Sequence, residues 1–310
     1  MDILKDLREK AKANKKTIVL TEYDDKRVAE AAKIIQAEGI AVPLLLTPDK
    51  VDQKEKQRYI EEYYELRKAK GVDIESVRKL FADDPLYYGA MLAREGKVDG
   101  FISGASHTTA DVCRAAITCI GLDPGMMIAS SCFIMVVPDC VYGDNGAFIF
   151  ADCGVVPDPN ARQLACIAIA SAELAEKVLG SRPRVALLSY STKGSAKGKD
   201  VEKVQEAVKI LKEMAPGLQA DGELQSDAAI VPEIAGIKAP GSPVAGKANV
   251  LIFPNLEAGN ICYKMTERLA KAKAVGPLLT GLKRPCSDLS RGCSAQDVVD
   301  CAAITALRCG

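Results

Sequence analysis

The first part of the chain alternates short β-rich runs with longer amphipathic stretches in which apolar residues recur at helical spacing. The predicted strands are TIVLTE (17–22), AVPLLLT (41–47) and VDGFISG (98–104). The predicted helices are DKRVAEAAKIIQAEG (25–39), QKEKQRYIEEYYELRKAKG (53–71) and TTADVCRAAITCIG (108–121). This alternation is typical of a doubly wound parallel sheet, and it predicts the α/β class.

The pattern changes in the middle of the chain. SCFIMVVPDC and GAFIFADC indicate adjacent strands, antiparallel if VYGDN (141–145) forms the turn between them. The α/β alternation then resumes with a helix over 160–180, a strand at RVALLSYS, a helix over 200–214, a strand at ANVLIFPN and a helix over 258–273. We therefore expect two α/β domains: domain I over 1–124 plus 281–310, which the last helix rejoins, and domain II over 125–280.

Composition excludes several classes of protein. Lys plus Arg equals Asp plus Glu, at 41 each, and no basic run stands out, so a nucleic-acid partner is not expected. The charged N-terminal stretch lacks the apolar core of a signal peptide, and the longest apolar stretch is too short to span a bilayer. Eleven cysteines without a C-x-x-C pair, and a single histidine, do not form a zinc pattern. We expect a cytoplasmic protein with no membrane partner, mostly buried free thiols and no metal site.

Ligands of doubly wound sheets bind beyond the carboxyl ends of the strands, where this chain has SGASHTTAD, SYSTKGSAKGK and PNLEAGN. SYSTKGSAKGK is rich in Gly, Ser and Lys ahead of a helix, which suits either an anion site or a solvated loop. GSPVAGKA (241–248) has P-loop spacing, but Ala248 replaces the magnesium-binding hydroxyl and a strand follows. His107 lies in a polar loop, which favours a hydrogen-bonding role over a catalytic one.

Three arginines are candidates for anion binding. Arg67 lies on a helix crowded with charges, where a surface cation is the simpler interpretation. Arg114 has apolar neighbours in sequence, so its partner is either Asp111 one turn away or a ligand. Arg291 comes just before a helix, where its guanidinium would be either solvated or bound to a phosphate.

DLSRGCSAQDVVD (288–300) ends in a helix start. Ser294 and Asp297 have the spacing of a capping box, which stabilises a helix by about 1 kcal/mol. On spacing alone the cap is the better interpretation of Asp297.

Several long segments together resemble the phosphotransacetylase (phosphate acetyltransferase) family, within the phosphate acetyl/butyryltransferases. They are FISGASHTTADVCRAAI, VPDCVYGDNGAFIFADCG, LSYSTKGSAKGKDVEKV, DGELQSDAAIVP, KAPGSPVAGKANVLIFPNLEAGNICYK and DLSRGCSAQDVVDCAAIT. The resemblance spans nearly the whole chain in order. It implies two α/β/α domains related to the isocitrate and isopropylmalate dehydrogenases, an active site in the cleft between them, and a homodimer.

The resemblance also implies an activity: reversible conversion of acetyl-CoA and phosphate to acetyl phosphate and CoA, by direct transfer in a ternary complex. CoA is a substrate, and no cofactor or metal takes part. By matching positions, Asp297 is the base, Ser290 stabilises the transition state and Arg291 binds substrate. Arg67 and Arg114 match CoA-binding arginines, and Cys140 matches a cysteine near the active site that is not a nucleophile.

The residue chemistry is compatible with these roles. A thiol with an ordinary pKa near 8.5 is mostly protonated at neutral pH, so a carboxylate such as that of Asp297 is needed to accept its proton. Ser290 can donate to the developing oxyanion and Arg291 can pair with the departing phosphate. From loop chemistry we expect Ser191, Thr192, Lys193 and Ser195 to line the phosphate subsite.

Three alternatives remain at the level of sequence. Phosphate butyryltransferase has the same chemistry on a longer acyl chain. A non-catalytic acyl-phosphate or CoA sensor of the same fold is disfavoured because Ser290, Arg291 and Asp297 are all present. A dehydrogenase of the related fold would need clustered carboxylates for a metal and a nucleotide loop, and the sequence has neither arrangement.

Overall fold

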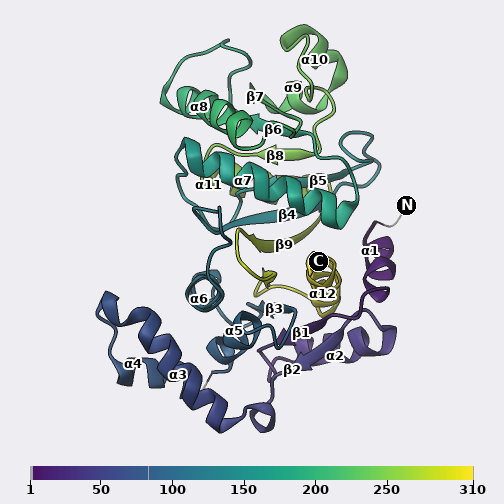
Figure 1. Ribbon diagram of the computed structural model, residues 1–310. Coiled ribbons are helices and arrows are strands. Elements are labelled where there is room, and N and C mark those ends of the chain that lie inside the picture. The colour runs from purple at the N-terminus through teal and green to yellow at the C-terminus, as the bar shows by residue number, and fades with distance from the viewer. Residues whose placement is uncertain (1–2, 83, 310) are drawn as a thin grey trace. The chain divides into compact units, whose positions relative to one another are not determined.

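The computed structural model describes residues 3–82 and 84–309, and these form two compact units. The first unit contains the described residues up to Gly125 together with those from Leu282 onward, and the second contains Met126–Gly281. Each is a mixed α/β unit (Figure 1). The mixed α/β class predicted from the sequence is confirmed.

The first unit has a parallel sheet in the order β2-β1-β3-β10. Its strands are β1 (Thr17–Leu20), β2 (Val42–Leu45), β3 (Gly100–Ser103) and β10 (Cys286–Asp288). Its helices are α1 (Ile3–Lys12), α2 (Lys26–Glu38), α3 (Gln53–Arg67), α4 (Ile74–Ala82), α5 (Leu86–Arg94), α6 (Thr109–Ala115) and α12 (Ala295–Arg308), with short helical turns η1 (Pro48–Lys50), η2 (Lys68–Lys70) and η3 (Ala116–Ile120).

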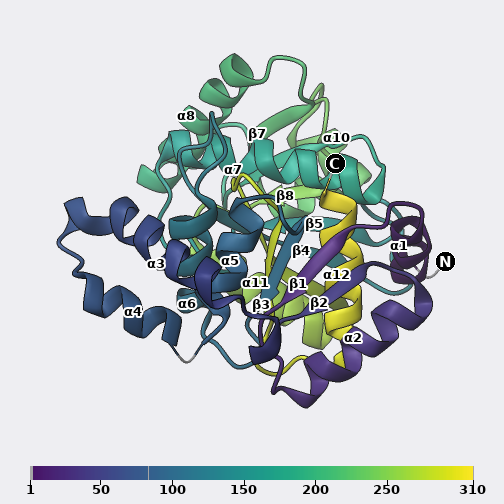
Figure 2. The same cartoon turned by 60° about the horizontal axis from the view of Figure 1, so that its bottom comes forward.

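Helices cover both faces of this sheet. α1, α2 and α12 pack together on one face, and α5 and α6 pack together on the other (Figures 1 and 2). α2 shows why the sequence specifies these elements: Val28, Ala31, Ala32 and Ile35 form its buried stripe at helical spacing. Asp25 caps its start, and Gly39 ends it with a φ of 68°, a left-handed conformation that suits glycine.

The second unit has a mixed sheet in the order β9-β4-β5-β8-β6-β7. Its strands are β4 (Ser130–Val136), β5 (Ala147–Ala151), β6 (Val185–Leu188), β7 (Ala220–Leu224), β8 (Val250–Ile252) and β9 (Lys273–Thr280). Its helices are α7 (Ala161–Leu174), α8 (Lys199–Met214), α9 (Ser226–Ile230), α10 (Pro232–Lys238) and α11 (Leu256–Leu269), with the turn η4 (Ala175–Leu179).

β4 is antiparallel to both β5 and β9, while β5, β8, β6 and β7 pair in parallel. The antiparallel pair suggested by SCFIMVVPDC and GAFIFADC is therefore confirmed. Phe133, Phe148, Phe150 and Phe253 form the aromatic centre of the core of this unit. The larger side chains of the core fill the space between the sheet and its helices, which fixes the sheet as a rigid platform.

Some predicted boundaries are wrong. The helix expected over 258–273 begins earlier and ends at Leu269, and Lys273 already belongs to β9. β7 and β10 were not predicted as strands, nor α9 and α10 as helices. GSPVAGKA is followed by β8, and the loop borders a cavity of about 340 Å³ beside α10, so it lacks the loop-to-helix context of a P-loop.

The cysteines behave as expected from their apolar surroundings. All eleven are free thiols, and all are buried except Cys140 and Cys262, which are partly buried. Burial raises the pKa of several of these thiols, and it raises the pKa of the Cys301 thiol to about 12. Such thiols are protonated at neutral pH and act as small apolar side chains.

Candidate active site

The carboxyl ends of β1, β3 and β10 in the first unit lead into three polar loops. β1 is followed by Glu22, β3 by the loop Gly104–His107, and β10 ends at Asp288, directly before Leu289 and Ser290. The Thr21 hydroxyl donates to Ser103 Oγ at 2.9 Å, and the Leu289 amide donates to the Ser103 carbonyl at 2.7 Å. These contacts join the three loops at the edge of the sheet where ligands of such folds bind.

Glu22 organises the loop that follows β3. Its carboxylate accepts the amides of Ala105, Ser106 and His107 at 2.8 to 3.0 Å, and the His107 ring at 2.8 Å. Burial by itself would raise the pKa of Glu22, but these donors outweigh it and lower the pKa to about 2. Glu22 is therefore a fixed negative charge that holds the loop.

His107 is a charged partner of this carboxylate. Its Nδ1 faces Glu22, and its Nε2 lies 2.5 Å from Asp84 Oδ2. The hydrogen bonds to Asp84 and Glu22 raise the pKa of His107 to about 10. The ring is thus protonated at neutral pH and unsuited to act as a base, which confirms the hydrogen-bonding interpretation of this residue.

Asp288 is a buried acid that sequence reasoning missed. Its side chain is fully buried, and neither carboxyl oxygen has a well-formed hydrogen bond to any residue that the structure describes. Burial raises the pKa of Asp288 to about 7, helped by the negative charge of Glu22 and opposed by the nearby Thr109 hydroxyl, Leu289 amide and His107 ring. The sequence did contain a signal for this residue, because an acidic residue stands two positions before the candidate Ser290.

The segment after β10 carries the candidates of the DLSRG stretch. Ser290 and Arg291 are both exposed. Ser290 Oγ accepts the Gly292 amide at 3.2 Å, and the Ser290 carbonyl accepts the Cys293 amide at 2.9 Å. The loop therefore turns tightly from Ser290 into α12.

Asp297 forms the capping box predicted from the sequence. Its Oδ2 accepts the Ser294 amide at 2.8 Å and the Ser294 hydroxyl at 2.9 Å, while the Asp297 amide donates to Ser294 Oγ at 3.2 Å. The side chain of Asp297 is partly buried at the start of α12. The cap fixes the orientation of the carboxylate on the segment that carries Ser290 and Arg291.

Arg67 and Arg114 lie near a pair of tyrosines in the first unit. The rings of Tyr63 and Tyr87 meet edge to face with centroids 5.4 Å apart. Burial raises the pKa of both tyrosines, whereas Arg67 acts in the opposite direction on Tyr63 and Arg114 does so on Tyr87. The structure thus brings both predicted arginines to one aromatic pair.

The two arginines differ in their partners. Arg114 NH1 lies 3.0 Å from Asp111 Oδ1, which confirms Asp111 as a partner, and its side chain is 58% exposed although its sequence neighbours are apolar. The reason is that its apolar neighbours Val112, Cys113 and Ala115 point inward from α6. The Arg67 Nε is buried and has no hydrogen-bond partner within the described part of the chain.

The remaining candidates lie in the second unit, in the loop after β6 and the turn after β4. Ser191 Oγ donates to Glu223 at 2.9 Å, Thr192 Oγ1 accepts the Gln225 amide at 2.9 Å, and Lys193 Nζ binds Asp221 at 2.6 Å. Ser195 Oγ accepts the Thr192 amide at 2.9 Å. These side chains are held by internal contacts with β7, and partly buried Cys140 packs at the edge of the core.

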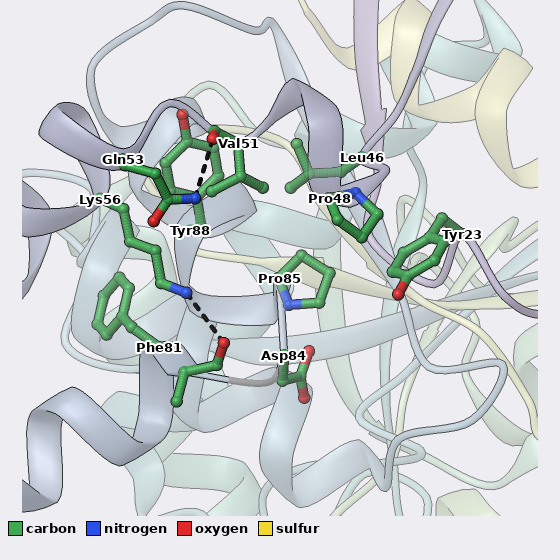
Figure 3. Close-up of a pocket in the computed structure, with 11 residues that line it drawn as sticks. Tyr23, Leu46, Pro48, Val51, Gln53, Lys56, Phe81, Asp84, Pro85 and Tyr88 are labelled. Carbon is green, nitrogen blue, oxygen red and sulfur yellow. Dashed lines mark hydrogen bonds between the residues drawn. The ribbon is translucent and has the colours of Figure 1, made fainter.

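A cavity of about 170 Å³ lies in the first unit near the ends of β1 and β2 (Figure 3). Aromatic and proline side chains line much of it, and several of its polar side chains are already paired. Lys56 donates to the Ala82 carbonyl at 2.9 Å, Gln53 to the Val51 carbonyl at 3.3 Å, and Asp84 faces His107. Internal hydrogen bonds therefore already hold three of the polar side chains that line this cavity.

Among residues 3–82 and 84–309, no group of three or more His, Cys, Asp or Glu side chains is arranged to hold a metal ion. None of the helices that these residues form combines the length and the apolar character needed to cross a membrane.

Comparison with known proteins places the chain in a family. The family model described as phosphate acetyl/butaryl transferase matches residues 2–306. A phosphate acetyltransferase of Acetivibrio thermocellus is 49% identical, covering 99% of this chain and 98% of that protein. Among solved structures, a phosphotransacetylase from Streptococcus pyogenes has a TM-score of 0.89 at 39% identity, covering 99% of this chain and 98% of its own. The EutD phosphotransacetylase from Staphylococcus aureus has a TM-score of 0.86 at 41% identity, covering 100% and 98%.

These matches define the class as an acyltransferase with an α/β fold. The chain belongs to the phosphate acetyl/butaryl transferase family.

Proposed function

We propose that this protein is a phosphate acetyltransferase, which interconverts acetyl-CoA and phosphate with acetyl phosphate and CoA. The observation that carries the proposal is similarity along the whole chain, at 49% identity, to proteins named phosphate acetyltransferase. Ser290, Arg291 and Asp297 all stand on one short segment after β10, which supports a reaction at this place. Acetyl transfer is direct, within a ternary complex.

Asp297 is the proposed base. In the direction of acetyl-CoA synthesis, its carboxylate accepts the proton of the CoA thiol, and the resulting thiolate attacks the carbonyl carbon of acetyl phosphate. A carbon–sulfur bond forms as the bond from carbon to the phosphate oxygen breaks, and phosphate leaves. The capping hydrogen bonds from Ser294 hold the carboxylate in a defined orientation for this transfer.

Ser290 and Arg291 act on the charges that develop in the reaction. The Ser290 hydroxyl accepts the Gly292 amide, so its own proton is directed away from that amide and can donate to the oxyanion. The exposed Arg291 guanidinium neutralises the departing phosphate, for which its planar fork is well matched. Together they supply charge stabilisation that is stronger in the transition state than in the ground state.

The other candidates bind the substrates. Arg67 and Arg114 are the proposed CoA-binding arginines, because phosphates are the anionic groups of CoA and both side chains lie at the Tyr63–Tyr87 pair. The loop with Ser191, Thr192, Lys193 and Ser195 is the proposed phosphate subsite, which requires hydroxyls now held by Glu223 and Gln225 to exchange partners. Cys140 is proposed to lie near the active site without acting as a nucleophile.

The reaction as proposed needs no cofactor or metal, because the base, the oxyanion donor and the phosphate-binding cation are all side chains. We further propose that the enzyme works in the cytoplasm as a homodimer. Light scattering of the purified protein tests the second point: a mass near twice 33.0 kDa is expected, and a mass of a single chain contradicts it.

The decisive experiment is release of free CoA from acetyl-CoA by the purified protein, followed with a thiol reagent, with and without phosphate. Phosphate-dependent release is expected, and its absence at saturating substrates would overturn the proposal. Parallel assays with butyryl-CoA separate the two activities in the family description. One methylene in an apolar pocket changes selectivity by about 1–3 kcal/mol, so a clear butyryl preference would reassign the substrate.

A further inference from the structure

Arg27, at the start of α2, holds an unusual concentration of contacts. The carboxylate of Asp25, the N-cap of the helix, accepts the Arg27 amide at 2.8 Å, its Nε at 3.0 Å and its NH2 at 2.6 Å. One acidic side chain therefore caps the helix and fixes the plane of the guanidinium. An arginine held in this way is already ordered before it meets any further partner.

The other face of the guanidinium reaches two distant loops. Its NH2 donates to the Ala105 carbonyl, in the loop after β3, at 2.8 Å. Its NH1 donates to the carbonyls of Arg291 and Cys293, in the loop after β10, at 2.8 Å and 2.9 Å. All the contacts lie within the first unit, and they connect the loops that follow three neighbouring strands.

The two carbonyls bound by NH1 belong to peptide groups with a particular position in the site. The carbonyl of Arg291 shares its peptide with the Gly292 amide, which donates to Ser290 Oγ at 3.2 Å. The carbonyl of Cys293 shares its peptide with the Ser294 amide, which donates to Asp297 Oδ2 at 2.8 Å. Because a peptide group is planar, fixing its carbonyl also fixes the direction of its amide.

We propose that Arg27 is a positioning residue for acetyl transfer, orienting Ser290 and Asp297 through these two peptide groups. The inference rests on the proposed function, since it assumes that both side chains act in the reaction. A cation on the carbonyl side also polarises each peptide and strengthens its amide as a donor. The five N–H groups of the Arg27 guanidinium all donate to protein groups, so the proposed role of Arg27 does not include contact with the substrates.

Only arginine satisfies this geometry. Five N–H groups in one plane meet Asp25, Ala105, Arg291 and Cys293 at the same time, whereas a lysine ammonium has three donors and no fixed plane. Lysine would keep the positive charge but would lose the simultaneous hydrogen bonds to both peptide carbonyls. The R27K substitution therefore separates charge from positioning.

The matched control is Arg8. It binds the buried Asp300 of the same helix, α12, through Nε and NH2 at 2.7 Å, and so contacts the helix itself rather than the loop that precedes it. R8Q should therefore reduce thermal stability without a matching loss of turnover. R27Q and R27K should reduce kcat by about 10- to 100-fold with KM for CoA changed less than about 3-fold, because misplacement of reacting groups affects mainly the chemical step.

Two further readouts distinguish positioning from simple stabilisation. Millimolar guanidinium should restore part of the kcat of R27A and should leave the kcat of R8A unchanged. Amide hydrogen exchange should accelerate at Gly292–Ser294 in R27Q and stay near the wild-type rate there in R8Q. Unchanged kcat in R27Q, or equal losses of kcat in R27Q and R8Q, would overturn the proposal.

The exchange measurement keeps this inference separate from the proposed function. If the wild-type protein releases no CoA, the proposed function fails, and unaltered exchange at Gly292–Ser294 in R27Q then also removes the positioning role. If the wild-type protein is active while R27Q matches it in kcat and in exchange, the positioning role alone fails.

Discussion

Asp297 combines a structural and a proposed chemical role in one carboxylate. The Asp297→Asn substitution retains an oxygen that can accept the Ser294 amide, but it removes the group that accepts a thiol proton. We expect kcat to fall by about 10²- to 10⁴-fold, the range for loss of a general base. Thermal stability should change by about 1 kcal/mol or less.

The matched variant is Ser294→Ala, which removes the capping hydroxyl and leaves the carboxylate. It should cost about 1 kcal/mol of stability and much less activity than Asp297→Asn. Stopped assays of both variants beside thermal melts make the comparison. Full activity in Asp297→Asn would reduce this residue to a helix cap.

The raised pKa of Asp288 predicts how the stability of the protein depends on pH. Burial raises the pKa of Asp288 in the folded protein to about 7, well above that of an ordinary aspartate, so the folded state retains a proton that the unfolded state releases. The stability from this group is fully present below about pH 4 and is lost as pH rises toward 7. At 1.36 kcal/mol per pH unit, the loss is of the order of a few kcal/mol.

The Asp288→Asn variant carries no such proton and tests this point. Its free energy of unfolding, measured with denaturant at each pH, should increase relative to that of the wild type between pH 4 and 7. Above pH 7 the difference should stay constant. Glu22 and His107 are present in both proteins, so their own titrations largely cancel in the difference. A difference that does not vary with pH would contradict the raised pKa of Asp288.

At the scale of elements, the loop between β3 and α6 passes so close to the end of β10 that only glycine fits at position 104. Gly104 has a φ of 115°, and a Cβ there would overlap Asp288 Oδ1 and lie 2.6 Å from the Leu289 amide nitrogen. Gly71 also has a positive φ, 78°, but a Cβ would meet nothing within 4 Å. Comparing substitutions at Gly104 and Gly71 therefore distinguishes the cost of backbone strain from the cost of a steric clash.

We expect Gly71→Ala to cost about 1–2 kcal/mol, the strain of a left-handed conformation alone. Gly104→Ala should cost about 4 kcal/mol or more, because the backbone of β10 must also move. Denaturant unfolding of both variants measures the difference. Equal costs would mean that the two loops separate more readily than their packing indicates.

The elements with strong periodicity were the ones that the sequence predicted well. α2, α3 and β1 have clear patterns and glycine or capping signals at their ends. β7 was missed because Asp221 and Glu223 make ADGEL look like a loop, although both acids are buried and paired. Their partners, Lys193 and Ser191, come from the loop after β6, and no local pattern records such a meeting.

At the scale of the whole molecule, the sequence was enough to identify the family and to select the DLSRG segment as a candidate site. It was not enough to identify the residues that support this segment. Arg27 is separated from the Arg291 and Cys293 carbonyls by more than 260 positions along the chain. Asp288 gains its raised pKa from burial and from Glu22, which lies on another strand end. Both effects arise only when the parallel sheet brings the strand ends together.

The proposed CoA-binding arginines come from separate helices of the first unit, since Arg67 ends α3 and Arg114 lies on α6. An arginine–phosphate pair contributes about 1.5–3 kcal/mol, so Arg114→Gln should raise KM for CoA by about 10-fold or more with little change in kcat. Stability should change little, because the exposed ion pair with Asp111 contributes at most about 1 kcal/mol.

Asp111→Asn is the matched variant, because it breaks the same ion pair while retaining the guanidinium. Its KM for CoA should equal or fall below that of the wild type, since Arg114 then has no competing carboxylate. Repeating both assays with dephospho-CoA identifies the phosphate: if the effect of Arg114→Gln disappears, Arg114 binds the 3′-phosphate, and if it persists, the diphosphate. An unchanged KM for CoA in Arg114→Gln would remove this arginine from the CoA site.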